Sequence, residues 1–199
     1  MGKGNTQLLE GKGHFGLCRR TQRSFDAAPS DPAAWAVGEV YNPALSEGGT
    51  AVTAPDLKPT FEFNEQIASS LMKTRRNAEG LHEYLGFKTI DVGPGTMQCQ
   101  FEVRAELLTP IGNMHGGVLS AFCDHLLGTV CYPVIKRGQW AATTEFKINL
   151  TRPVTQGCVD GYARIVNLGR TQAVVQIDVH NDGRICALAQ GTVTIMDPR

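Results

Sequence analysis

A short run of glycines directly before an apolar stretch is the part of this sequence best suited to chemistry. The run begins at Asn113, passes through His115, Gly116 and Gly117, and continues into an apolar stretch that ends at Gly128. Glycines at the start of a helix let a ligand approach the backbone, because no Cβ intrudes. The first N–H groups of a helix have no internal partner, and the helix dipole makes that end positive. Gly116 and Gly117 are therefore the expected donors to a carbonyl oxygen that becomes negatively charged, with His115 fixing the turn or touching the substrate.

One acidic residue, Asp124, lies within this apolar stretch. A helix that is hydrophobic on all sides is normally buried, and burying a carboxylate is costly unless it is paired or functional. Asp124 follows His115 by nine positions, about 13 Å along a helix and roughly half a revolution around it. One chain cannot easily bring Asp124 and its own Gly116 N–H to one small carbonyl. Two antiparallel copies could, so we hypothesise a composite site in a homodimer; the alternative is a monomer in which Asp124 caps a loop.

This stretch resembles the hotdog-fold acyl-CoA thioesterases, specifically their phenylacetate-degradation (PaaI-like) branch within the 4-hydroxybenzoyl-CoA thioesterase superfamily. Proteins of that branch carry a His-Gly-Gly turn that opens a central helix, with Asp eight or nine residues after the His. The residues that match this pattern are His115, Gly116, Gly117 and Asp124. Residues 142–153 and 167–171 are also similar, and the resemblance covers about residues 80 to 196.

The resemblance implies a role for several residues. It implies that the Gly116 N–H polarises the thioester carbonyl, and that Asp124 acts as nucleophile or as general base toward water. It places Thr143 where the family often has a Ser or Thr that helps hold the acid or the water. Similar proteins place basic residues near loop ends, where they meet the phosphates of coenzyme A. Arg170, in a predicted turn, is the first choice for this contact, and Arg152, Lys136 and Arg137 are further candidates.

One position departs from the family pattern. Members often carry Asn six residues before the His, and this chain has Thr109 there. Asn113 could substitute in orienting the substrate, but its position differs. The orienting role stays open between these two residues.

Each of these residues also has a plain structural explanation. Asp124 could be a satisfied buried acid, and the glycines could serve only a tight turn that needs positive φ. Thr143 alternates with Glu145 and Lys147, which suits a solvated or interfacial threonine. His125 points about 100° away from Asp124 on a helix, so packing or an interface is its expected role.

Composition excludes several classes of protein. The chain has 199 residues and a formal net charge of zero, so no basic surface argues for binding nucleic acid. No apolar run approaches the length of a membrane span. The six cysteines are scattered without a CxxC or CxxH pair, so we expect reduced thiols, no disulfide framework and no zinc site. The thiols favour a cytoplasmic location, and the basic first 25 residues leave organelle targeting as an alternative.

The chain divides near residue 60 into two parts. Residues 1–60 hold half of the ten prolines and show no sustained period, which predicts a flexible or irregular extension. Residues 61–199 form the predicted domain. It begins with helical periodicity after a cap at Asn64, and Gly80 breaks that stretch into two helices.

Alternating apolar and polar residues predict strands near 87–92 and 97–107, followed by a buried helix from about Met114 to Tyr132. Further strands are expected near 140–151, 157–168, 171–182 and 185–195. Strand, helix and antiparallel meander indicate an α+β fold in which one long helix is wrapped by a curved antiparallel β-sheet. The hotdog fold that the resemblance implies has the same arrangement.

The leading hypothesis is an enzyme that hydrolyses an acyl-CoA thioester to a free acid and coenzyme A. It needs no metal or other cofactor, because a thioester is already activated and coenzyme A enters as part of the substrate. The alternative is a non-catalytic acyl-CoA or fatty-acyl binding protein, although binding alone gains nothing from a buried acid. The acyl group and the choice between a dimer and a dimer of dimers stay open.

Overall fold

The computed structural model describes residues 62–73 and 80–198, which build one six-stranded sheet and the helices packed on it. The strands are β1 Lys88–Gly93, β2 Thr96–Glu102, β3 Trp140–Leu150, β4 Cys158–Leu168, β5 Gln172–Asn181 and β6 Arg184–Met196. Their order across the sheet is β1-β2-β4-β5-β6-β3, and each strand is antiparallel to its neighbours. The predicted extension, residues 1–60, lies outside the described residues.

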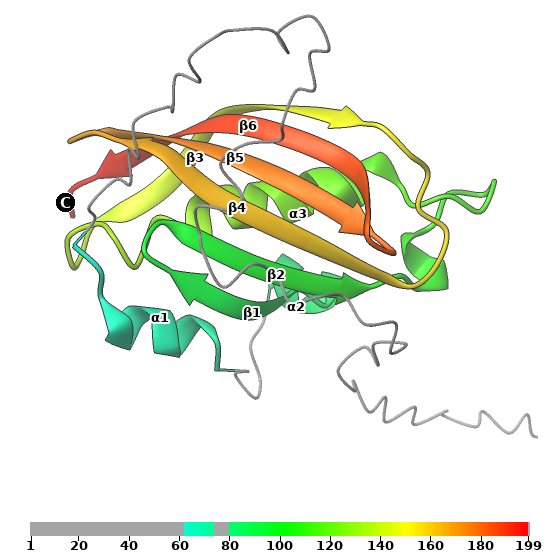
Figure 1. Cartoon of the computed structure of the whole chain (residues 1–199), viewed down its shortest axis with the longest axis horizontal. Helices are drawn as coiled ribbons and strands as arrows, with labels where there is room; N and C mark the ends of the chain where they lie inside the picture. Colours follow the sequence, from blue (N-terminus) through cyan, green and yellow to red (C-terminus); the bar gives the residue numbers. More distant parts are fainter. Residues whose placement is uncertain (1–61, 74–79, 199) are drawn as a thin grey trace, which may run out of the picture.

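The helices are α1 Glu65–Leu71, α2 Leu81–Leu85 and α3 Gly116–Thr129, with a short 3-10 helix at Ala105–Leu107. Asn64 caps α1 by accepting a hydrogen bond from the Ile67 N–H (3.1 Å), and Gly80 precedes α2, both as predicted. Figure 1 shows α3 lying along one face of the curved sheet, so the predicted α+β arrangement is confirmed. No helix within the described ranges is long and apolar enough to cross a membrane.

One face of α3 forms the centre of the core. Its buried side chains are Leu119, Phe122, Cys123, Leu126 and Leu127. The Phe122 ring centroid lies 4.8 Å from that of Phe101 in β2 and 4.9 Å from that of Phe87, in the tilted geometries that aromatic pairs favour. The sheet covers only this face, and Gly117 and Asp124 on the other side of α3 are exposed.

Gly161 in β4 allows α3 to lie close to the sheet. A Cβ at this position would lie 2.5 Å from Phe122 Cε1 and 2.6 Å from Leu126 Cδ1, and both side chains are fully buried. We expect Gly161→Ala to lower the free energy of unfolding by about 1–3 kcal/mol, because the core has no room for the added carbon. Thermal unfolding followed by circular dichroism measures the loss. Gly169→Ala is the control, because its Cβ would meet only the Gln172 carbonyl oxygen at 3.4 Å; equal losses in both variants would contradict the close approach.

A β-bulge in β3 decides which of its residues face α3. The pairing of β3 with β6 skips one residue, Thr144, between Thr143 and Glu145. Because side chains alternate along a strand, one extra residue exchanges the two faces beyond it. The predicted common face of Thr143, Glu145 and Lys147 is therefore wrong. Glu145 accepts a hydrogen bond from the Thr192 hydroxyl (2.7 Å) on the face away from α3.

Beyond the bulge, Phe146 and Ile148 pack against the core. Gly191 in β6 lies opposite Phe146 in the ladder. A Cβ on Gly191 would lie 2.6 Å from both the Glu145 carbonyl oxygen and Phe146 Cβ, so the absent side chain makes room for the bulged strand.

The strand predicted over 97–107 ends earlier, at Glu102. Glu102 pairs with Cys158, which is the first residue of β4, so no described strand pairs with the chain beyond Glu102 on that side. Residues 105–107 form the 3-10 helix instead. Local alternation therefore continues past the point at which the ladder stops.

The helix predicted from Met114 to Tyr132 is also shorter. Met114 stays extended because its N–H donates to the Val154 carbonyl (2.6 Å), and the helix begins two residues later. At the other end Val130 is the C-cap and the chain continues as turns.

The remaining strands begin and end within one residue of their predicted bounds. The hairpin between β5 and β6 turns through Asp182 and Gly183, with φ of 50° and 74°. Two successive residues with positive φ are typical of a type I′ turn, for which the Asn-Asp-Gly sequence is well suited.

The free thiols of the described residues are Cys99, Cys123, Cys131 and Cys186, and all four are buried. Burial raises the pKa of Cys99, Cys123 and Cys131 to about 12, so these thiols stay protonated and are poor nucleophiles. The expectation of reduced cysteines is met at these four positions. It is wrong for Cys158, which is disulfide-bonded.

Candidate active site

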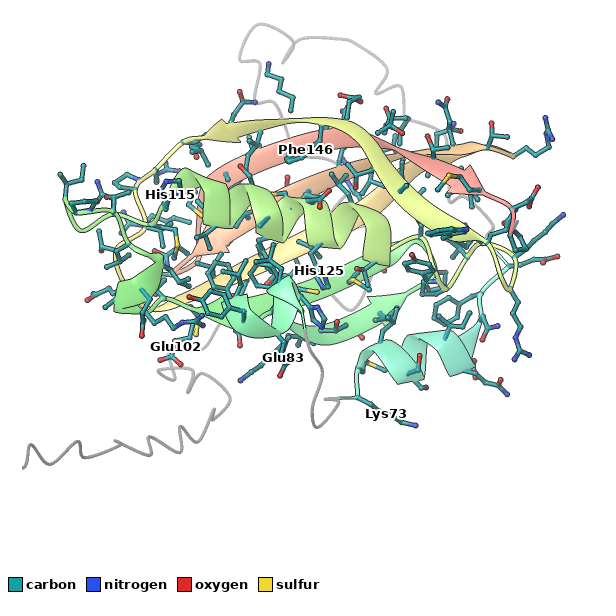
Figure 2. All side chains as sticks on the ribbon, turned by 180° about the vertical axis from the view of Figure 1, so that it is seen from behind. Lys73, Glu83, Glu102, His115, His125 and Phe146 are labelled. Atoms are coloured by element: carbon teal, nitrogen blue, oxygen red, sulfur yellow. The ribbon has the colours of Figure 1, made fainter. Side chains whose placement is uncertain are left out.

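The turn before α3 is held by His115, which is the N-cap of the helix. Its backbone is extended (φ −66°, ψ 128°), and its Nδ1 accepts a hydrogen bond from the Gly117 N–H at 2.9 Å. Figure 2 shows His115 at one end of α3. This hydrogen bond satisfies one of the helix's unpaired donors and fixes the turn, which is the structural role expected of His115.

The Gly117 N–H already donates to His115, whereas the Gly116 N–H remains available to a ligand. Within the part of the chain that the structure describes, the Gly116 N–H meets no hydrogen-bond acceptor. A Cβ on Gly116 would lie 2.9 Å from Leu150 Cδ1, and one on Gly117 would lie 3.0 Å from His115 Nδ1. The absence of side chains at these two positions lets a ligand reach the backbone of the turn.

Asp124 lies in the wall of an open pocket of about 320 Å³. The residues that line this pocket are Asp124, His125, Gly128, Thr129, Tyr132, Ala141 and Thr143. One wall is the C-terminal half of α3, and the other is the beginning of β3, before the bulge. The structure thus brings Asp124 and Thr143 to one pocket, although Thr143 was expected to share a face with Glu145.

Asp124 is exposed in the single chain, so the prediction of a buried carboxylate is wrong for the single chain. The apolar residues of α3 suggested burial on all sides, but the sheet covers only one face. The Asp124 carboxylate takes part in no hydrogen bond or ion pair with any residue in the ranges 62–73 and 80–198. It is therefore neither a satisfied core acid nor the cap of a described loop.

His125 packs between α3 and α2 (Figure 2). Its ring stacks on His82 at 5.5 Å with an interplanar angle of 6°, and it lies 5.6 Å from the Phe87 ring. Burial lowers the pKa of His125 to about 4, with a further lowering from His82 and an opposing effect of Asp124. The imidazole is therefore neutral at neutral pH, and the expected packing role of His125 is confirmed.

The pocket and the glycine turn belong to different ends of α3. Gly116 precedes Asp124 by eight residues, which is about 12 Å along a helix. Arg170 lies in the β4–β5 turn, at the same end of the sheet as the pocket. The beginning of β5, just after Arg170, pairs with the end of β6. The end of β6 also pairs with the beginning of β3, which lines the pocket. Arg152 follows the other end of β3 and donates from Nη1 to the Ile185 carbonyl (2.6 Å).

The loop before the turn contains the two candidates for orienting a substrate. The Asn113 carbonyl accepts a hydrogen bond from the Thr109 N–H at 2.7 Å, which closes the loop. Thr109 Oγ1 is buried and has no partner among the described residues. Neither side chain is thereby assigned to a substrate.

The sequence did not draw attention to Gly128, Thr129, Tyr132 or Ala141, which complete the pocket. Their only local signal is the four-residue step from Asp124 to Gly128 and on to Tyr132, which places the three near one face of a helix. The opposing wall, Ala141, comes from a strand whose position relative to the helix cannot be read from local pattern. Within the described ranges, no three His, Cys, Asp or Glu residues gather as metal ligands.

Comparisons with known proteins point to thioesterases. The model of the thioesterase superfamily matches residues 111–187, which include the turn, α3 and both walls of the pocket. The proofreading thioesterase EntH of Cronobacter turicensis is 27% identical over 117 residues, which cover 58% of this chain and 85% of EntH.

Solved structures show the same arrangement of helix and sheet. A variant of the phenylacetic acid degradation protein PaaI from Thermus thermophilus is 32% identical, with a TM-score of 0.53, over 57% of this chain and 96% of PaaI. A conserved protein from Pseudomonas aeruginosa is 29% identical, with a TM-score of 0.58, over 65% of this chain and 99% of that one. By fold, by the matched segment and by these relatives, the chain belongs to the thioesterase superfamily and is a PaaI-like hotdog thioester hydrolase.

Proposed function

We propose that this protein hydrolyses an acyl-CoA thioester to a carboxylic acid and coenzyme A, at a site built from two chains. The observation that carries the proposal is Asp124, an exposed carboxylate without a described partner in the wall of a pocket. Coenzyme A enters as part of the substrate. The proposal requires no further cofactor, because a thiolate, whose conjugate thiol has a pKa of about 8.5, is already a good leaving group.

The chemistry has two requirements, and the chain offers a group for each. The carbonyl oxygen becomes negative as the new C–O bond forms, and the Gly116 N–H at the positive end of α3 would donate to it. The Asp124 carboxylate would either take a proton from the attacking water or attack the carbonyl itself. In the first route the C–S bond then breaks, and the departing thiolate takes up the proton that Asp124 removed from water. In the second route breaking of the C–S bond leaves a mixed anhydride on Asp124, the thiolate takes a proton from solvent, and water then hydrolyses the anhydride to the free acid. Thr143 would help hold the water or the carboxylate.

Two copies of the chain would bring these groups together. Among the described strands β3 is an edge strand that pairs with β6 alone, so its other side offers N–H and C=O groups that no described strand pairs. Pairing two β3 strands about a two-fold axis would extend the sheet and set the two α3 helices antiparallel. The glycine turn of one copy would then face Asp124 of the other. Within one chain the two groups are about 12 Å apart along α3, which is too far for both to contact one carbonyl group.

The other candidate residues have supporting parts in this proposal. His115 holds the turn that presents the Gly116 N–H, and Gly117 leaves space for the acyl carbonyl. Asn113 would orient the substrate, and Arg170 and Arg152 would contact the phosphates of coenzyme A. Arg170 lies in the β4–β5 turn and Arg152 follows the end of β3, at opposite ends of the sheet, so in a two-fold assembly they would reach the substrate from different copies.

Release of free thiol from a panel of acyl-CoAs, from acetyl-CoA to palmitoyl-CoA and including benzoyl-CoA, tests the proposed function. Turnover of at least one member is expected. Tight binding of acyl-CoA without turnover of any of them would contradict hydrolysis and support a non-catalytic binding protein.

Mixing two inactive chains tests the composite site. We expect co-expressed Asp124→Asn and Gly116→Pro chains to recover about a quarter of wild-type thiol release, because half of randomly formed dimers are mixed and each mixed dimer holds one intact site. Each variant purified alone is the control. If the mixture were no more active than its parents while mixed dimers were present by mass spectrometry, the site would lie within one chain.

A further inference from the structure

An exposed leucine at the end of β3 lies against the glycine turn. Beyond the bulge, Phe146, Ile148 and Leu150 point to the face of β3 that carries α3. Phe146 and Ile148 pack against the core, whereas Leu150 is 52% exposed. A Cβ on Gly116 would lie only 2.9 Å from Leu150 Cδ1. The leucine side chain therefore lies directly beside the bare backbone of the residue that carries the proposed donor.

Hydrogen bonds hold the backbone at Leu150 in place. Leu150 pairs with Ala187 in the ladder between β3 and β6. The next residue, Thr151, donates from its N–H to the Cys186 carbonyl at 2.8 Å and from its hydroxyl to the Ile185 carbonyl at 3.3 Å. The exposed side chain thus projects from a fixed strand and not from a loose end. A ligand that contacts it does not have to order the backbone first.

The thioester carbonyl has two substituents, the acyl group and the coenzyme A arm. A carbonyl oxygen bound to the Gly116 N–H would lie about 3 Å from that nitrogen, so one substituent would pass beside Leu150. The pocket beside Asp124 has a different character, because most of its lining is polar: His125, Thr129, Tyr132 and Thr143. The amides and hydroxyl of the coenzyme A arm can use such partners, whereas a hydrocarbon chain cannot. The acyl group is the substituent that suits the leucine.

On the basis of the proposed function, we propose that Leu150 contacts the acyl group, and that it does so from the chain that supplies the Gly116 donor. The coenzyme A arm then runs through the pocket beside the partner's Asp124, toward the end of the sheet where Arg170 lies. Leu150 is a specificity-determining residue that favours butyryl and longer hydrocarbon groups over acetyl. Each further methylene that it covers should raise kcat/KM by about fourfold.

The first test is kcat/KM for acetyl-, butyryl-, hexanoyl- and decanoyl-CoA. In the wild type we expect hexanoyl-CoA to exceed acetyl-CoA by at least about tenfold. Leu150→Ala should lower the value for hexanoyl-CoA by about tenfold and the value for acetyl-CoA by less than about threefold. Leu188→Ala is the matched control. It removes another exposed leucine, which is 38% exposed on β6 and points away from α3, because its neighbours Ala187 and Ala189 face the core. It should keep the wild-type profile.

The second test shows which chain's leucine acts on a given substrate. In a mixed dimer of one Asp124→Asn chain and one Gly116→Pro chain, the intact site takes Gly116 from the first chain and Asp124 from the second. Leu150→Ala added to the Asp124→Asn chain should therefore reduce the preference for hexanoyl-CoA. The same change added to the Gly116→Pro chain should leave that preference unchanged. The reverse result would overturn the proposal, because the leucine would then act from the Asp124 side.

The outcomes also distinguish this inference from the proposed function. If the wild type hydrolyses acyl-CoAs but Leu150→Ala keeps the ratios among the four substrates, the role of Leu150 is overturned and the proposed function stands. Equal losses on all four would overturn it as well, because they would indicate a damaged turn or a weaker dimer, which size-exclusion chromatography measures. A wild type without turnover on any acyl-CoA would contradict the proposed function, and this inference with it.

Discussion

Asp124→Asn is expected to lower kcat for acyl-CoA hydrolysis by about 10²–10⁴-fold, the contribution typical of a positioned general base. Asparagine keeps the shape of the side chain but can neither accept the proton of water nor attack the carbonyl. Because Asp124 is exposed and has no partner among the described residues, the substitution removes no described contact. Free thiol release measures the rate, and calorimetry with a non-hydrolysable acyl-CoA analogue measures binding, which should persist.

The control for this variant is Asp91→Asn, which removes the charge of another exposed aspartate, on β1. It should retain wild-type kcat, and both variants should unfold at the wild-type temperature. An Asp124→Asn protein that is folded and keeps more than about a tenth of wild-type kcat would remove Asp124 from the chemistry, because a tenfold loss is below the usual effect of such a group.

Gly116→Pro is expected to lower kcat by about 10²–10³-fold, the effect of removing one donor from an oxyanion site. Proline is tolerated at the first position of a helix because the N–H it lacks has no partner within the helix. His115, with φ −66° and ψ 128°, already has the backbone conformation favoured before proline. The substitution therefore removes the Gly116 donor while the helix can still begin at the same residue.

Gly116→Ala is the matched variant, since it also adds a Cβ but keeps the N–H. In both variants the added carbon would meet Leu150 Cδ1, at 2.9 Å before any adjustment. Leu150 is 52% exposed at this end of β3, so its side chain has space to move. The ratio of kcat between the Ala and Pro variants isolates the contribution of the donor. Equal values of kcat would show that the Gly116 N–H plays no part in the reaction.

Much of the fold can be predicted from the sequence because its signals are local. Alternation within a strand and the Asn-Asp-Gly turn need only neighbouring residues, and every predicted strand except the one over 97–107 begins and ends within one residue of its observed bounds. The turn at His115, its two glycines and the apolar helix behind them are likewise contained in one continuous segment. The candidate turn could therefore be found before any three-dimensional information.

What could not be predicted depends on residues far apart in the chain. The bulge in β3 requires the space left by Gly191, which belongs to a different strand. The exposure of Asp124 depends on which face of α3 the sheet covers, and residue types alone suggested that all faces are buried. The end of β2 at Glu102 depends on the beginning of β4. Each error thus arose where a partner element, rather than the local pattern, decides the outcome.

The extra residue at Thr144 has a consequence for how this domain can vary in length. Before Thr144, small side chains of β3 line the pocket, and beyond it Phe146 and Ile148 fill the interior. Deleting Thr144 would leave Thr143 opposite Val193 and Glu145 opposite Thr192, so the strand would alternate regularly and both halves would keep their faces. Insertions and deletions are commonly accepted in surface loops, and at this one position a strand of the domain could also become shorter without turning its interior residues outward.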